Sequence, residues 1–231
     1  MNTQKITTSL FATLLLLTPG IARSQEPNLR KVFAEMDASA PKFQDVTADI
    51  DVDNYTAVVQ DHQMDKGSTA FRRAGGSIEM AMTLNKGQQG ERDILYRNGE
   101  LHYYQPDAKQ ETILAAGANR AQYDSLLSTG FGATSKDLNS GWEVRFDGME
   151  AIGGIQTAKL ALVPRLDNIR NNIKQLTIWV DLSRDISLKQ VMTQPDGDTR
   201  TVVYSKIRYN THLGDKLFTL KVPNGTQVQR R

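Results

Sequence analysis

Apolar and polar residues alternate with a period of two over several stretches of this chain. The alternating stretches are residues 48–52, 78–84, 142–146, 176–180 and 218–222. Strands with one apolar and one polar face are typical of an antiparallel sheet that has its core on one side. Helical and alternating segments do not follow one another regularly, which argues against a parallel sheet. The sequence therefore predicts a mainly β fold, of the α+β type, with an antiparallel sheet.

Short turn signals separate these stretches. The signals are Asn98-Gly99, Asp147-Gly148, Gly153-Gly154, Asp196-Gly197 and Asn224-Gly225. Asn, Asp and Gly reach positive φ angles at low cost, so such dipeptides favour the tight turns of hairpins. We therefore expect strands that follow one another through short connections.

Three segments lack the alternation. Residues 29–43 carry apolar side chains at helical spacing and predict an amphipathic helix, which Pro41 is expected to stop or bend. Residues 118–139 are expected to form a central helical insertion, and residues 167–175 either a short helix or a long loop. Because no repeat or linker divides the chain, residues 25–231 are expected to form a single domain.

Residues 1–24 have the pattern of a secretory signal peptide. Lys5 precedes an apolar run at 10–17, and Ala22-Arg23-Ser24 provides a small-x-small cleavage motif. The run is well short of the ~20 residues that a membrane span needs, although a short membrane anchor is the alternative. No cysteine follows the cleavage point, so the mature chain cannot be acylated there. We expect the protein to be soluble after cleavage.

The charge of the chain is nearly balanced. The full sequence has a formal net charge of +2, and residues 1–24 contain Lys5 and Arg23 but no acid. The mature part is therefore neutral overall and has no electrostatic footprint for nucleic acid. The chain contains no cysteine, which excludes disulfides, thiolate metal ligands and a cysteine nucleophile.

The sequence offers no catalytic or metal-binding motif. The 3 histidines are far apart, at His62, His102 and His212. Residues 49–60 begin like a calcium loop, but the sixth position is Asn54 instead of glycine and the twelfth is Gln60 instead of glutamate. No nucleophile elbow, P-loop or dinucleotide fingerprint is present. We therefore expect neither an enzyme nor a bound cofactor or metal.

Several short elements follow one another in a recognisable order. Residues 67–71 lead into Arg72-Arg73, and Tyr103-Tyr104-Gln105-Pro106 is followed by Gln110. The later elements are residues 160–164, 178–181, 195–199 and 218–228. In order and spacing, and over essentially the whole mature chain, the sequence resembles the outer-membrane lipoprotein carrier (LolA-like) family.

This resemblance implies both a fold and a function. The fold would be an incomplete, strongly curved antiparallel β-barrel, in which the amino-terminal helix and the central helical insertion cover an apolar cavity. The function would be that of a periplasmic chaperone that binds lipoprotein acyl chains and carries them from the inner to the outer membrane. Its partners would be acylated lipoproteins or lipids, an inner-membrane release complex and an outer-membrane acceptor. We expect a monomer, since a transfer protein must leave its cavity mouth free.

Other functions compete with this one. The first alternative is a periplasmic lipid or apolar-ligand binding or sensing module of the same fold, followed by a cell-envelope hydrolase and a purely structural sheet domain. The expected cavity lining comes from one face of the strands, although each residue could also be plain core. The expected lining residues are Ile50, Val52, Ile78, Met80, Met82, Leu84, Ile94, Tyr96, Leu176 and Ile178.

A lid that fills the empty cavity would compete with bound acyl chains and allow their release. The expected lid residues are Leu29, Val32, Phe33, Met36, Leu126, Leu127 and Phe131. The resemblance implies that Arg73 locks this lid through hydrogen bonds to lid carbonyls. Proline usually follows that arginine in the family, whereas Ala74 follows it here. A solvent-facing arginine at the cavity rim is the alternative.

Overall fold

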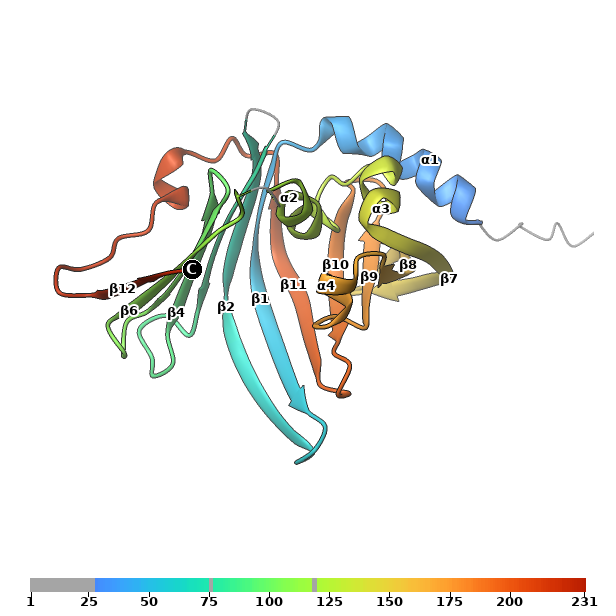
Figure 1. The fold of residues 1–231 in the computed structure, drawn as a ribbon. Coiled ribbons are helices and arrows are strands. Elements are labelled where there is room, and N and C mark those ends of the chain that lie inside the picture. The colour runs from blue at the N-terminus through green and yellow to red at the C-terminus, as the bar shows by residue number, and fades with distance from the viewer. Residues whose placement is uncertain (1–27, 75–76, 118–119) are drawn as a thin grey trace, which may run out of the picture.

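The computed structural model describes residues 28–74, 77–117 and 120–231 (Figure 1). These residues form one 12-stranded sheet with the order β12-β6-β5-β4-β3-β2-β1-β11-β10-β9-β8-β7. Neighbouring strands pair antiparallel, except for β12, which pairs parallel with β6. The expected mainly β, antiparallel class with an amino-terminal helix is confirmed. The expected strongly curved β-barrel is wrong: the sheet of the described residues is not closed or strongly curled, and β12 and β7 are its edges.

Every alternating stretch except the last lies in a strand. The strands are β1 (Asp45–Thr56), β2 (Asp61–Ala74), β3 (Ser77–Leu84), β4 (Arg92–Arg97), β5 (Glu100–Gln105), β6 (Gln110–Ala115), β7 (Trp142–Ile152), β8 (Ile155–Pro164), β9 (Gln175–Asp181), β10 (Ile186–Thr193), β11 (Thr199–Tyr209) and β12 (Gln227–Arg230). In β1, Ala48, Ile50 and Val52 are buried, while Asp49 and Asp51 between them are partly exposed. The period of two thus reports which face of the sheet carries the core.

One expected turn is a bulge instead. Asp147-Gly148 lies inside β7, where the pairing with β8 shifts between Phe146 and Met149. Gly148 has a φ of 100°, a conformation that favours glycine and that an extra residue in a strand often needs. A dipeptide that is typical of hairpin turns also suits a bulge, so composition alone does not distinguish the two.

The amino-terminal helix is shorter than expected. α1 (Leu29–Ser39) covers the first part of the segment 29–43, and a 3₁₀ turn, η1 (Ala40–Lys42), follows it. Pro41 lies in this turn, so the expected end of the helix near this proline is confirmed. Phe43 lies beyond the helix and packs into the core of the sheet.

The central insertion contains two helices. These are α2 (Arg120–Ser128) and α3 (Ser135–Gly141), and residues 118–119 of the expected insertion lie outside the described residues. Figure 1 shows α2 over the middle of one face of the sheet, which we call the helix-covered face. α4 (Asp167–Arg170) shows that the later ambiguous segment begins as a short helix.

The helix-covered face carries two clusters of buried side chains. One, around Ile50 and Met80, packs against Leu127 of α2. The other joins Met36 of α1 to Trp142 of β7 and to residues of β8 and β9. The helices thus cover the sheet at two different places, and α1 lies over the β7–β9 part.

The chain after β11 crosses the opposite face of the sheet, which we call the outer face. The alternation at 218–222 predicted a strand there, and this expectation is wrong. A short 3₁₀ helix, η3 (Asp215–Phe218), ends at the fully buried Phe218, and Leu220 packs beside it against the outer face. The alternation therefore reflects packing on top of a sheet, without strand pairing.

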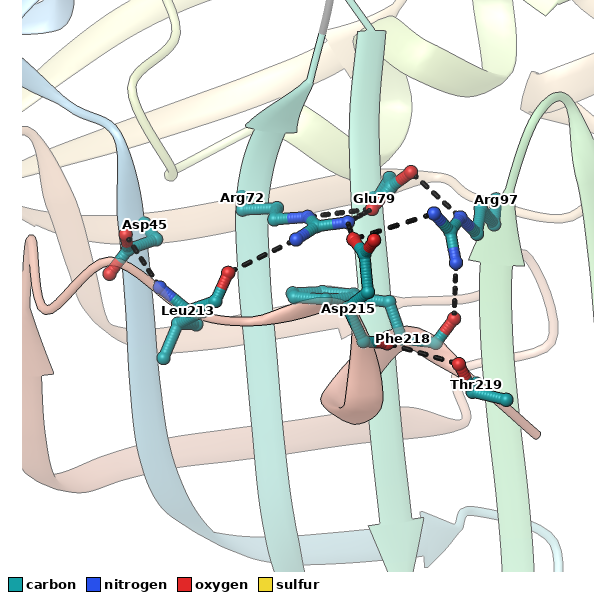
Figure 2. Close-up of polar contacts among 8 residues, drawn as sticks. All are labelled: Asp45, Arg72, Glu79, Arg97, Leu213, Asp215, Phe218 and Thr219. Atoms are coloured by element: carbon teal, nitrogen blue, oxygen red, sulfur yellow. Dashed lines mark hydrogen bonds and ion pairs between the residues drawn. The ribbon is translucent and has the colours of Figure 1, made fainter. Parts of the chain in front are cut away.

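Polar contacts hold this carboxyl-terminal segment in place (Figure 2). Arg72 of β2 donates to the carbonyl of Leu213 over 3.0 Å and to the carboxylate of Asp215 over 2.5 Å. Its Nε donates to the buried carboxylate of Glu79 over 2.7 Å. Arg97 donates to the same carboxylate and to the carbonyl of Phe218, over 3.0 and 3.1 Å. Two arginines and one glutamate thus fasten the segment to three strands.

One expectation lies outside the described residues. The signal peptide expected at residues 1–24 falls in the part of the chain that is not described. Among the described residues, no helix has both the length and the apolar character that a membrane crossing requires.

Candidate functional site

An apolar pocket of about 280 Å³ lies between the helix-covered face and the insertion that contains α2. The insertion contributes Leu126, Leu127, Thr129 and Phe131. The sheet contributes Phe71, Met80, Met82, Ile94, Leu176, Gln190, Met192, Arg200, Val202 and Tyr204, and Ile173 precedes β9. Most of these side chains are apolar, so the pocket suits an apolar ligand.

The structure brings together part of the expected lining. Met80, Met82, Ile94 and Leu176 line the pocket. The other expected residues are buried in the surrounding core and do not line it: Ile50, Val52, Ile78, Leu84, Tyr96 and Ile178. Alternation identifies the face of the sheet to which all of them belong, but the position of α2 decides which part of that face remains uncovered.

The expected lid divides into two parts. Leu126 and Leu127 of α2 are partly buried and line the pocket. By contrast, Leu29, Val32, Phe33 and Met36 of α1 belong to the cluster over β7–β9 and do not line this pocket. The spacing of apolar residues shows that α1 has a buried face, but it does not show against which strands that face packs.

Phe131 is held firmly by its neighbours. Its ring stacks on Phe71 with a centroid distance of 4.1 Å and meets the edge of Tyr204 at 5.3 Å. Its backbone also forms a bridge with Ile186 of β10. Phe131 is therefore a fixed wall of the pocket, whereas α2 provides its cover.

Among the polar contacts that attach the insertion to the sheet, two are made by Tyr96 and Arg73. The hydroxyl of the fully buried Tyr96 donates to Asp124 of α2 over 2.5 Å. Burial and this carboxylate raise the pKa of Tyr96, so the phenol stays protonated as a donor. The second contact is donated by Arg73 of β2 to the carbonyl of Gly132, between α2 and α3. Such a contact to a carbonyl of the insertion is what the resemblance implied for Arg73.

Position 132 requires a glycine. Its φ is 69°, and a Cβ atom there would lie 2.7 Å from the ring of Phe43. Its amide donates to the carbonyl of Asp185 over 2.8 Å, so the turn that receives Arg73 is fixed from both sides. A side chain at this position would displace the carbonyl that accepts from Arg73.

A buried carboxyl group lies near the same turn. Asp185 is 0% exposed, and neither of its carboxyl oxygens has a hydrogen-bond partner among the described residues. Burial raises its pKa to about 8; the charge of Arg73 opposes this shift, and the charges of Asp37 and Asp137 add to it. The group is therefore mostly protonated at neutral pH.

The histidines do not form a metal site. His62 lies 2.9 Å from a carboxylate oxygen of Asp53, and His102 lies 2.8 Å from one of Glu111. No group of three or more His, Asp or Glu side chains suited to a metal occurs in the described part of the chain. Both contacts are ordinary cross-strand pairs.

Sequence reasoning missed some of the lining. Arg200, Val202 and Tyr204 share one face of β11 and line the pocket. Their spacing of two residues was present in the sequence, but the arginine broke the apolar pattern. In the sequence, Phe71 stands only at the end of the stretch 67–71 that leads into Arg72-Arg73.

The described residues thus form a helix-covered, mostly antiparallel sheet with an apolar pocket. No protein-family model matches this sequence, and no curated protein matches it significantly. Solved structures do match, MucB among them, with 10% identity over 83% of this chain and a TM-score of 0.51. This chain spans 62% of that MucB chain, which is less than two thirds of its length.

Two further solved structures are similar. An uncharacterised conserved protein from Thermus thermophilus matches with 10% identity over 87% of this chain and 98% of its own, at a TM-score of 0.51. A LolA superfamily protein from Nitrosomonas europaea matches with 13% identity over 84% of this chain and 98% of its own, at a TM-score of 0.40. These matches show a shared fold, and a protein of the LolA superfamily, the family that the sequence resembles, is among them.

Proposed function

We propose that this protein is a periplasmic chaperone that binds lipoprotein acyl chains and carries them from the inner to the outer membrane, without catalysis. The observation that supports this proposal is the apolar pocket between the sheet and α2. Each methylene that leaves water contributes about 0.8 kcal/mol, so such a surface binds acyl chains without covalent chemistry. Residues 1–24 would direct export, and residues 25–231 would act as a monomeric domain.

The size of the pocket favours a movable cover. About 280 Å³ is slightly below the roughly 300–1,000 Å³ of typical small-molecule sites. The several acyl chains of a lipoprotein therefore fit only if α2 moves away from the sheet. Leu126 and Leu127 occupy space that the cargo would take, so closing and binding compete. This competition keeps binding weak enough for transfer from a release complex to an acceptor.

The same volume supports a second candidate. A pocket of this size can hold part of one lipid chain as it stands, which suits a periplasmic protein that binds or senses a single lipid. MucB, which shares the fold, has been crystallised in complex with MucA. A LolA-like sheet can therefore also serve recognition of a protein partner.

Mass spectrometry of ligands that copurify with the protein from its own cell envelope separates the candidates. Acylated peptides would support the carrier, and free lipids would support the binding or sensing protein. A preparation with no apolar ligand, which also fails to bind a hydrophobic fluorescent probe, would contradict both.

A charge placed inside the pocket tests its role directly. Met82→Asp should weaken binding of a hydrophobic fluorescent probe by about tenfold or more, because a carboxylate in an apolar site loses its hydration. Met64→Asp is the matched control, since Met64 lies on β2 with 59% of its surface exposed. Leu127→Asp places the charge on α2 and should give the same loss without changing a strand. Equal probe affinity in all the variants would show that the ligand binds elsewhere.

A further inference from the structure

Among the described residues that line the apolar pocket beneath α2, Arg200 is the only charged one. It lies on β11 opposite Asn54 of β1 and Met192 of β10. Val202 and Tyr204, which follow on the same face of the strand, line the same pocket. The register of β11 thus places a guanidinium among apolar side chains.

The acid that attracts Arg200 is already engaged. Asp65 of β2 is almost fully buried, with 1% of its side chain exposed. One of its oxygens lies 2.5 Å from Arg92 and accepts from Asn85 over 2.6 Å, while the other accepts from Asn54 over 2.9 Å. Burial alone would raise the pKa of Asp65, but these contacts outweigh it and hold the pKa below its usual value. Arg92 therefore neutralises this carboxylate, and Arg200 remains as surplus positive charge.

Arg200 itself has no such partner. In the three described ranges of the chain, its side chain makes no hydrogen bond or ion pair within the usual distances. Burial and the nearby charge of Arg92 both lower its pKa, more than Asp65 raises it. Keeping a partly buried guanidinium without an acceptor is costly. Its planar set of donors matches the oxygens of a carboxylate or a phosphate.

We propose that Arg200 binds the negatively charged headgroup of an amphiphile, a carboxylate or a phosphate, while the acyl chain lies against Met82, Ile94 and Leu126. This inference rests on the proposed lipid-binding function and names the ligand class, an anionic lipid. It explains why an arginine lies in an otherwise apolar pocket beside a carboxylate that is already paired. A neutral lipid would leave the guanidinium uncompensated.

Competition against a bound fluorescent probe tests this assignment. The competitors are hexadecanoate, hexadecyl phosphate, methyl hexadecanoate and inorganic phosphate, at neutral pH and below micelle-forming concentrations. The two anionic amphiphiles should bind at least about tenfold more tightly than the ester. A hydrogen bond between two charged groups is stronger than one between neutral groups. In Arg200→Gln this preference should fall to about twofold or less, because the anionic amphiphiles lose their charged partner.

Two variants serve as controls. Arg208→Gln removes an exposed arginine from the same strand and should keep the full preference. Arg200→Lys keeps the charge without the planar fork and should keep part of the preference, which also shows that the site tolerates substitution.

Each contrary result has a separate meaning. If the ester binds as tightly as the acids and Arg200→Gln changes nothing, the headgroup assignment is wrong while lipid binding stands. If inorganic phosphate displaces hexadecyl phosphate at equal concentration, the site binds free anions, and the lipid assignment is wrong. If no amphiphile displaces the probe, both this inference and the proposed function fail.

Discussion

Among single residues, Asp185 most clearly makes stability depend on pH. Its carboxyl has a pKa of about 8 in the folded protein, compared with an ordinary value of 3.8. Between these values the folded chain keeps the proton and the unfolded chain releases it, so stability falls as pH rises from about 4 to about 8. Above that range both states are charged, and the loss is complete.

Asp185→Asn removes this dependence, because an amide does not ionise. As the pH rises over that range, the wild type should lose ~2 kcal/mol or more of unfolding free energy relative to Asp185→Asn. Urea unfolding at several pH values measures it. Asp61→Asn, at an exposed position on β2, should follow the wild type. Parallel pH profiles for Asp185→Asn and the wild type would show that the carboxyl is charged in the folded protein.

At the scale of secondary-structure elements, Arg73 of β2 donates to the turn between α2 and α3, and we propose that this contact keeps the pocket covered. Arg73→Leu removes the donor to the Gly132 carbonyl, a charged hydrogen bond of about 1.5–3 kcal/mol. The insertion should then close less well over the sheet, compete less with bound lipid and release it about tenfold more slowly. Transfer of a fluorescent lipid from the loaded protein to acceptor vesicles measures this rate. Arg73→Lys retains a donor and should release lipid faster than Arg73→Leu. Equal rates in all three proteins would rule out a lid-locking role.

The elements also show how far the sequence predicts this fold. Alternation located four of the twelve described strands, β1, β3, β7 and β9, because a strand with one buried face must alternate. It could not show that α1 covers β7–β9 instead of the pocket, since helical spacing reveals a buried face but not its partner. The pairing of β12 with β6 joins segments far apart in the chain and has no local signal. Arg200 of β11 carries a surplus charge because Arg92 of β4 already pairs with Asp65 of β2. Only the folded sheet brings these three strands together.

At the scale of the whole molecule, the carboxyl-terminal segment links the middle of the sheet to one of its edges. It leaves β11, crosses the outer face through η3 and adds β12 beside β6. Glu79 is central to this crossing, because both Arg72 and Arg97 contact its carboxylate and each also donates to a carbonyl of the segment (Figure 2). The side chain of Glu79 is 7% exposed, so solvent screens these pairs little.

Glu79→Gln should therefore destabilise the protein by about 3 kcal/mol, because it leaves two partly buried guanidinium groups without their shared counter-charge. Urea unfolding measures the loss, and hydrogen exchange should show faster exchange at the amides of 213–220 and of β12 than elsewhere. Asp167→Asn is the control, since Asp167 pairs with Arg170 while its side chain is 91% exposed, and such surface pairs contribute little. If Glu79→Gln unfolds at the same urea concentration as this control, the ion pairs of Glu79 do not stabilise the segment, and its other contacts, such as the packing of Phe218, hold it to the sheet.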